Sequence, residues 1–229
     1  MRPMRVLALA GLSTALLGTA NADIESSIGV GYSSDYVFRG NNNGADLFDA
    51  SIDVSGSGDL GGISGLDWSA GLWLASFEGG NELDIYGSVS QCLSDTLTVS
   101  VGVTSYSYFG GGGGNAANDL EPYVSLGTSL GGISLGVGAY YDESDNYDHD
   151  IYWEITAGHE IDLGGNMSLG ISGVIGHFDD GAVDTFYGVS AGLSIAVSDS
   201  ITVTPHISHT VDGASGDETV TGVSVGFAF

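Results

Sequence analysis

The chain has 229 residues with 29 acidic and three basic side chains, and its formal net charge of −26 at pH 7 excludes nucleic acid as a partner. Such charge is common in disordered chains, but 42% of these residues are hydrophobic and the mean hydropathy is +0.20, so a folded protein is expected. The single cysteine, Cys92, excludes a disulfide scaffold, and 39 glycines with three prolines favour strands and turns over helices.

The chain begins with the pattern of a secretory signal peptide. Two arginines precede a short apolar stretch, and Ala20-Asn21-Ala22 then provides a cleavage site. The apolar stretch is too short to span a bilayer as a helix. We therefore expect a signal peptide over residues 1–22 and a single mature domain over residues 23–229.

From there to the C-terminus, apolar residues alternate with small or polar ones at a period of two, which is typical of strands with two different faces. Leu97, Val99, Val101 and Val103, for example, alternate with Thr, Ser and Gly. The pattern predicts twelve strands near residues 24–38, 46–55, 66–77, 82–91, 96–109, 119–130, 133–142, 150–161, 167–178, 184–197, 200–210 and 218–229.

Three features favour a membrane-spanning barrel over a secreted sandwich with the same period. Many predicted strands have about 10–14 residues, whereas strands of soluble proteins average about 5–6 and tilted membrane strands need about 9–11. Connections after even-numbered strands are mostly tight, and those after odd-numbered strands are longer. The last strand ends with Phe227 and Phe229 on one face, which resembles the assembly signal of outer-membrane barrels.

The predicted fold is therefore all-β: a closed antiparallel transmembrane β-barrel of about twelve strands. Closure leaves no unpaired strand edge in the lipid, which is the condition for strands to cross a membrane. The expected location is the outer membrane of a Gram-negative bacterium, with outer-membrane lipid and the barrel-assembly machinery as partners.

The stretch SSDYVFRG (residues 33–40), followed by ELDIYGSVS, VGVTSYSYF and EPYVSLG, resembles the TorF family of porins. That family overlaps a group of proteobacterial proteins whose first strand carries an S-D-Y-x-F-R-G motif. After the motif this chain has Asn41-Asn42-Asn43-Gly44, where those relatives tend to have an Ile/Ser/Gln-like segment. The resemblance implies an outer-membrane barrel with a pore, and it implies no particular substrate.

If apolar residues face the lipid, the alternation of side chains along each strand (its parity) decides which residues face the inside of the barrel. In the first strand it places Ile28, Val30, Tyr32, Tyr36 and Phe38 outside. The predicted pore-lining residues are Asp35, Arg39, Asp49, Asp53, Asp84, Glu121 and Glu154. Most other inward residues are Gly, Ser, Thr or Ala, which are too small to fill a lumen of twelve strands. The sequence thus predicts a narrow acidic channel that concentrates cations.

Arg39 is the only basic residue after the predicted cleavage site. A guanidinium group among carboxylates is expected to form a bidentate pair with one of them, and distance favours a partner on the second or twelfth strand. In one interpretation the pair ties the first strand to an acidic neighbour and fixes its register. In the other, Arg39 is the positive side of a transverse field at a constriction.

Catalytic patterns are weak in this sequence. GVSAG and GVSVG fit the nucleophile-elbow pattern, but they lie inside predicted strands rather than at a junction of strand, turn and helix. His159, His177 and His209 fall on the apolar face, where a membrane-embedded phospholipase would use a histidine and a serine, but no outward serine is placed beside them. We therefore expect no enzyme and no cofactor.

One loop is rich in carboxylates. Asp142, Asp145, Asp148 and Asp150 fall in the stretch DESDNYDHD, and loops rich in oxygen ligands suit divalent cations such as Ca²⁺. The stretch lacks the glycine and the final glutamate of an EF-hand loop, so a solvated surface loop is the other interpretation. No metal site is predicted, and these four residues are kept as a weak candidate.

The predicted function is passive diffusion of small hydrophilic solutes or ions through a porin-like channel that favours cations. One alternative is a non-conducting structural or adhesive barrel, which would need bulky inward residues or a folded-in loop. A second alternative is an outer-membrane enzyme.

Overall fold

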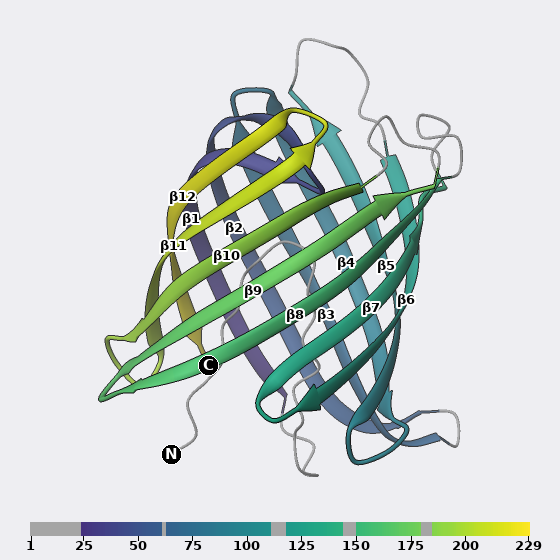
Figure 1. Ribbon diagram of the computed structural model, residues 1–229. Helices are drawn as coiled ribbons and strands as arrows, with labels where there is room; N and C mark the ends of the chain where they lie inside the picture. The colour runs from purple at the N-terminus through teal and green to yellow at the C-terminus, as the bar shows by residue number, and fades with distance from the viewer. Residues whose placement is uncertain (1–23, 61–62, 111–117, 144–149, 180–184) are drawn as a thin grey trace.

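A computed structural model describes residues 24–60, 63–110, 118–143, 150–179 and 185–229. Within these residues, twelve strands form one closed antiparallel barrel, in which each strand pairs with its neighbours in sequence and β1 closes on β12 (Figure 1). The predicted all-β barrel is confirmed. The predicted signal peptide lies outside the described residues. In the described part of the chain, no helix has the length and apolarity needed to cross a bilayer.

All twelve predicted strands are present, and most of their bounds differ from the prediction by a few residues. The largest difference is in β2, which is twice as long as predicted, because its ladder with β1 continues to Asn41 and its ladder with β3 continues to Leu60. The strands are β1 (Glu25–Phe38), β2 (Asn41–Leu60), β3 (Ile63–Phe77), β4 (Gly80–Cys92), β5 (Leu97–Phe109), β6 (Asn118–Leu130), β7 (Ile133–Tyr141), β8 (Ile151–Gly164), β9 (Met167–Phe178), β10 (Thr185–Ala196), β11 (Ile201–Gly213) and β12 (Gly216–Ala228).

The outer face of the barrel is apolar. Ile28, Ile52, Leu72 and Ile85 stand opposite one another across β1 to β4, and their exposed fractions lie between 37% and 59%. Their neighbours along each strand point to the inside, because successive side chains of a strand alternate between its two faces. An apolar exterior around a closed sheet is typical of a barrel that spans lipid.

Tight turns join the strands at the end of the barrel where the C-terminus lies (Figure 1). Gly131 and Gly132 connect β6 to β7, both with positive φ, and at the β8–β9 connection Gly165 and the last residue of β8, Gly164, also have positive φ. Positive φ at both central residues defines the type I′ turn, whose twist matches that of the flanking strands. These glycines therefore allow the hairpin connections to be short at this end.

At the opposite end, the β1–β2 hairpin leaves the barrel wall. Pairing of β1 with β12 stops at Ser33, and pairing of β2 with β3 begins at Phe48, whereas β1 and β2 pair with each other as far as Phe38 and Asn41. Residues 34–47 are therefore a hairpin with no strand ladder to either neighbour. We call this segment the tongue.

Candidate functional site in the barrel lumen

The tongue ends in a two-residue turn, Arg39-Gly40, that reaches into the barrel. The φ angles of these residues are 48° and 79°, as in a type I′ turn. Glycine adopts positive φ freely, but the left-handed conformation costs about 1–2 kcal/mol for a residue with a Cβ atom. Arginine is thus an unfavourable residue for the first position of this turn, and contacts of its side chain must offset the conformational cost.

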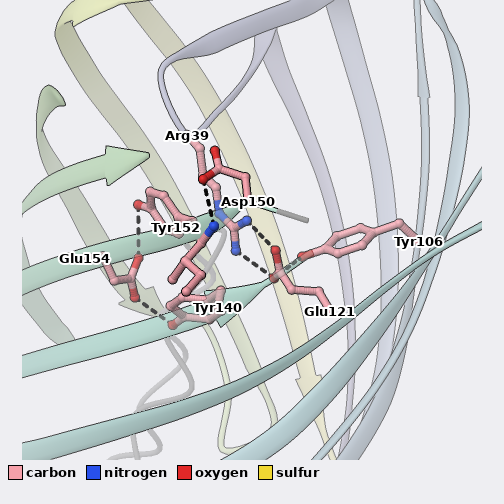
Figure 2. A network of polar contacts seen from close by, with 8 residues as sticks. Arg39, Tyr106, Glu121, Tyr140, Asp150, Tyr152 and Glu154 are labelled. Carbon is pink, nitrogen blue, oxygen red and sulfur yellow. Dashed lines mark hydrogen bonds and ion pairs between the residues drawn. The ribbon is translucent and has the colours of Figure 1, made fainter. Parts of the chain in front are cut away.

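Arg39 crosses the lumen to the far wall. β6, β7 and β8 are the strands most distant from β1 around the ring. Nη1 and Nη2 of Arg39 donate hydrogen bonds of 2.5 and 2.7 Å to Oε2 and Oε1 of Glu121 on β6 (Figure 2). Glu121 is buried, and the Tyr106 hydroxyl donates to the same Oε1 at 3.1 Å. The result is a bidentate ion pair whose carboxylate is held by a further hydrogen bond.

Aromatic rings surround the guanidinium group. Its Cζ atom lies 4.1 Å from the ring centroid of Tyr152, 4.9 Å from that of Tyr140 and 4.8 Å from that of Phe38. All three distances are within the range of about 6 Å for cation–π interactions. The hydroxyls of Tyr140 and Tyr152 donate to Glu154 at 2.7 and 3.3 Å, so a second buried carboxylate fixes the orientation of two of the rings.

Bulky side chains gather in the lumen where the tongue enters it. Two clusters form among the described residues: one is built on Tyr36 and Leu47 of the tongue, and the other on the far wall. The first comprises Tyr36, Leu47, Ala75, Phe38, Trp73 and Phe77, and the second comprises Tyr140, Tyr152, Phe186, Tyr123, Val174 and Phe178. At this level of the barrel, bulky side chains therefore lie in the lumen beside the small inward residues.

Two predicted lumen residues, Asp49 and Asp53, lie on β2 below the tongue. Asp49 accepts a hydrogen bond of 3.3 Å from Nε1 of Trp73, and Asp53 accepts one of 2.5 Å from the Tyr86 hydroxyl. Both carboxylates are thus oriented by aromatic donors on β3 and β4 rather than by Arg39.

A second acidic pair, Glu82 and Asp84, lies on the inner face of β4. Glu82 is 0% exposed, and no described residue donates a hydrogen bond of favourable geometry to either of its carboxyl oxygens or to Oδ1 of Asp84. The Tyr36 hydroxyl of the tongue and the Tyr108 hydroxyl lie near the Glu82 carboxyl group. The described lumen therefore holds more buried carboxylates than Arg39 can neutralise.

The tongue corrects two predictions about the first strand. Tyr36 and Phe38 were predicted to face outside, but both pack inside the barrel, since the strict alternation breaks between Ser33 and Tyr36, which both lie on the lumen side. Asp35 is next to Tyr36 on the strand, so its side chain points to the opposite face.

The expected partner of Arg39 on the second or twelfth strand was also wrong. Its partner is Glu121, which was predicted separately as a lumen residue. Parity along the strands also put Tyr140, Tyr152 and Glu154 on the inner face, but a period-two pattern cannot say which residues meet across the lumen. Tyr106 was the residue of this network that the sequence did not single out.

The histidines of the outer face lie beside a backbone carbonyl group or a threonine, and His177 Nε2 also lies 3.8 Å from Asp179 Oδ1. His159 Nδ1 lies 2.9 Å from the Gly132 carbonyl oxygen, and His209 Nδ1 lies 2.8 Å from Thr219 Oγ1. His177 Nδ1 lies 3.1 Å from Thr185 Oγ1. These hydrogen-bond partners are a carbonyl group and two threonines, and none of them is the serine that a membrane-embedded phospholipase would need.

The weak metal candidate lies largely outside the described residues. Asp145 and Asp148 are in residues 144–149, while the backbone N–H of Asp142 donates to the carbonyl oxygen of Asp150 at 3.1 Å. Among the described residues, no group of three or more acidic, histidine or cysteine side chains is placed to hold a metal ion.

The two terminal phenylalanines close the barrel. Phe227 stands opposite Ile28 of β1 and Ile201 of β11, and the backbone N–H of Phe229 donates to the Ser26 carbonyl oxygen at 3.0 Å. Their role as an assembly signal stays a prediction.

Solved structures of outer-membrane barrels resemble this one. The NanC porin is 14% identical, with 88% of this chain and 98% of that chain covered and a TM-score of 0.57; for the KdgM porin the values are 12%, 89%, 99% and 0.55. Outer membrane phospholipase A from Escherichia coli is 13% identical, with 90% and 97% covered and a TM-score of 0.53. At these identities the likeness shows the fold alone.

Comparison by sequence finds a protein family but no curated relative. No curated protein matches the chain significantly. The family Gcw_chp, described as a bacterial protein of unknown function, matches residues 18–224, which is nearly the whole of the predicted mature chain. The chain therefore belongs to the Gcw_chp family.

Proposed function

We propose that this protein is a porin-like channel for the passive diffusion of small hydrophilic solutes or ions, with cations favoured. The observation that carries the proposal is the charge of the described lumen, in which Asp49, Asp53, Glu82, Asp84 and Glu154 are accompanied by one guanidinium group that is already paired with Glu121. Surplus negative charge in a narrow, poorly solvated passage attracts cations and repels anions. The barrel likeness to the NanC and KdgM porins supports the channel part of the proposal.

The tongue controls the channel in this proposal. With Arg39 on Glu121, the tongue and the clusters around Tyr36 and Tyr140 narrow the lumen. Because the tongue has no strand ladder to β12 or β3, it can shift while the wall stays paired. The structure then represents the closed or nearly closed state of the channel.

The deciding experiment is conductance in planar lipid bilayers. Purified protein is added to one chamber, and discrete current steps are expected, with a reversal potential in a KCl gradient that indicates cation preference. An absence of steps over repeated insertions, with folded protein shown to be present in the membrane, would contradict the proposal. It would favour the non-conducting structural or adhesive barrel, which the folded-in tongue and the aromatic clusters also fit.

The enzyme alternative has the fold likeness to outer membrane phospholipase A in its favour. We propose a channel rather than an enzyme, since the described contacts of the outward histidines are with a carbonyl group, threonines and the Asp179 carboxylate, and not with a serine. The proposed setting is the outer membrane of a Gram-negative bacterium, reached through the barrel-assembly machinery. The resemblance of residues 33–40 to the TorF family belongs to the same proposal.

A further inference from the structure

We propose that the site around Glu121 is a binding site for small solutes that carry a guanidinium group, and that Arg39 is its built-in occupant. The inference rests on the proposed function only in that a solute reaches the site through the lumen. It adds a class of ligand, and binding of that ligand would displace Arg39 and release the tongue.

The donors and acceptors of the site match a guanidinium group. The two Glu121 oxygens accept from both terminal nitrogens of Arg39, which is the planar fork that an ammonium group or a spherical ion cannot reproduce. Tyr106 orients this carboxylate from behind. The Tyr152 and Tyr140 rings lie 4.1 and 4.9 Å from the guanidinium carbon and shield it from water.

Most of this site belongs to the wall and not to the tongue. Tyr106 is on β5, Glu121 on β6, Tyr140 on β7 and Tyr152 on β8, which are four consecutive strands of the barrel. Hydrogen bonds from the two tyrosines to Glu154 hold their rings independently of Arg39. If the tongue moves away, a preformed anionic site with aromatic walls remains (Figure 2).

The charge of the site also requires a cation. Glu121 and Glu154 are both buried, and Arg39 forms an ion pair with only the first of them in the described structure. Withdrawal of Arg39 would leave two buried carboxylates without a counter-charge, which is strongly unfavourable. A cationic solute that enters the site removes this penalty, so release of the tongue and binding of the solute are coupled.

Few contacts outside the lumen oppose release of the tongue. The described tongue is fastened there by hydrogen bonds from Asn42 N–H to Ser215 Oγ, from the Ser215 hydroxyl to Asn41 Oδ1, from Glu78 N–H to the Ala45 carbonyl oxygen, from Thr221 N–H to Ser34 Oγ and from the Tyr32 hydroxyl to Asp46 Oδ1. The positive φ of Arg39 also disfavours the bound conformation of the turn. A free guanidinium solute carries no such strain.

The test compares ligand binding with and without the internal occupant. Wild type, Arg39→Ala and the double variant Arg39→Ala/Glu121→Gln are refolded in detergent, and their folding is checked by circular dichroism. Binding of methylguanidinium is measured by isothermal titration calorimetry, with methylammonium as a cation without the fork and methylurea as a neutral molecule of similar shape.

Arg39→Ala is expected to bind methylguanidinium at least about tenfold more tightly than wild type, because a site that is no longer occupied binds in proportion to its free fraction. Methylammonium should bind more weakly than methylguanidinium, methylurea should not bind, and Arg39→Ala/Glu121→Gln should lose the affinity for methylguanidinium. Equal affinity of wild type and Arg39→Ala, or binding that survives the loss of Glu121, would overturn the proposal.

A second measurement uses the intact site, in case Arg39→Ala does not fold. A spin label at position 42, in Asn42→Cys with Cys92→Ala, is expected to become more mobile when methylguanidinium is added, and not when methylammonium is added at the same concentration. An unchanged label spectrum at saturating methylguanidinium would contradict the coupling. Neither measurement needs ion conduction. A protein that binds methylguanidinium but conducts no ions would therefore contradict the proposed channel and still support the proposed binding site.

Discussion

Arg39 combines two features that oppose folding, a left-handed backbone and a buried charge, and one set of contacts offsets both. Its φ of 48° costs about 1–2 kcal/mol, and its guanidinium group lies deep in the lumen. The bidentate pair with Glu121 and the stacking on Tyr152 act only when the turn has this conformation. A side chain at the first turn position can reach the far wall, which explains why the one arginine among the described residues lies there.

The first prediction concerns selectivity. Arg39→Ala removes the fixed positive charge from the lumen, so the variant should assemble and become more cation-selective than wild type. Reversal potentials in a KCl gradient measure the change. Arg39→Lys, which keeps the charge and loses the fork, is the matched control and should stay near the wild-type value. An unchanged reversal potential in Arg39→Ala would place Arg39 outside the conduction path and make its role structural.

At the scale of elements, the tongue explains the SDYVFRG stretch of residues 34–40. Every residue of the stretch lies on the first strand of the tongue or in its turn. Tyr36 anchors one cluster, Phe38 stacks under the guanidinium group, and Arg39 with Gly40 forms the turn. The stretch therefore encodes a hairpin that bends away from the wall, rather than a membrane-spanning strand segment.

The second prediction concerns the stability of the tongue. Breaking a buried ion pair by removing one partner costs about 3 kcal/mol or more, which corresponds to roughly 100-fold faster opening. Glu121→Gln should therefore accelerate amide hydrogen exchange in residues 35–45 by that order while the amides of the wall stay protected. Tyr106→Phe, which removes one neutral donor to Glu121 worth about 1 kcal/mol, is the control and should accelerate exchange only about fivefold. If the amides of residues 35–45 exchange as slowly in Glu121→Gln as in wild type, other contacts hold the tongue.

The third prediction tests whether movement of the tongue opens the channel. The Asn42 N–H and Ser215 Oγ lie 2.9 Å apart, so Asn42→Cys and Ser215→Cys in a Cys92→Ala background should form a disulfide across the tip of the tongue. The oxidised protein is expected to conduct less than the same protein after reduction, in single-channel recordings. If both states conduct equally, the tongue does not gate the lumen. The Cys92→Ala parent shows whether the reductant acts by itself.

At the scale of the whole molecule, the closed sheet accounts for stability in lipid. Each strand pairs on both sides in the ring from β1 to β12, and the exposed apolar residues lie on the outer face. Changes in the lumen leave this ring untouched, because the lumen residues point away from the lipid and the tongue adds no ladder to the wall.

The fourth prediction follows from that separation. The wild-type protein and Arg39→Ala should both show β-type circular dichroism in detergent micelles and both migrate differently on detergent gels before and after heating. A chain that is monomeric and soluble without detergent would contradict the membrane barrel. A loss of heat-modifiable migration in Arg39→Ala alone would show that the tongue is needed for assembly of the wall.

The sequence by itself determined the strands, their two faces and the closure of the sheet. These follow from local rules: a period of two, turn glycines such as Gly131 and Gly132, and apolar residues such as Ile52 and Leu72 that must all face the same solvent. The same alternation placed Glu121, Tyr152 and Glu154 on the inner face, because parity needs only the neighbours along one strand.

Only the tertiary structure decided what occupies the lumen. The ladder of β1 with β12 stops at Ser33, and residues 34–47 then follow their own twist into the barrel, so Tyr36 and Phe38 change sides. The partner of Arg39 is 82 residues away on a strand nearly opposite in the ring. Such a contact depends on how far a hairpin bends and on the width of the closed barrel, and neither quantity is encoded in the alternation of any single strand.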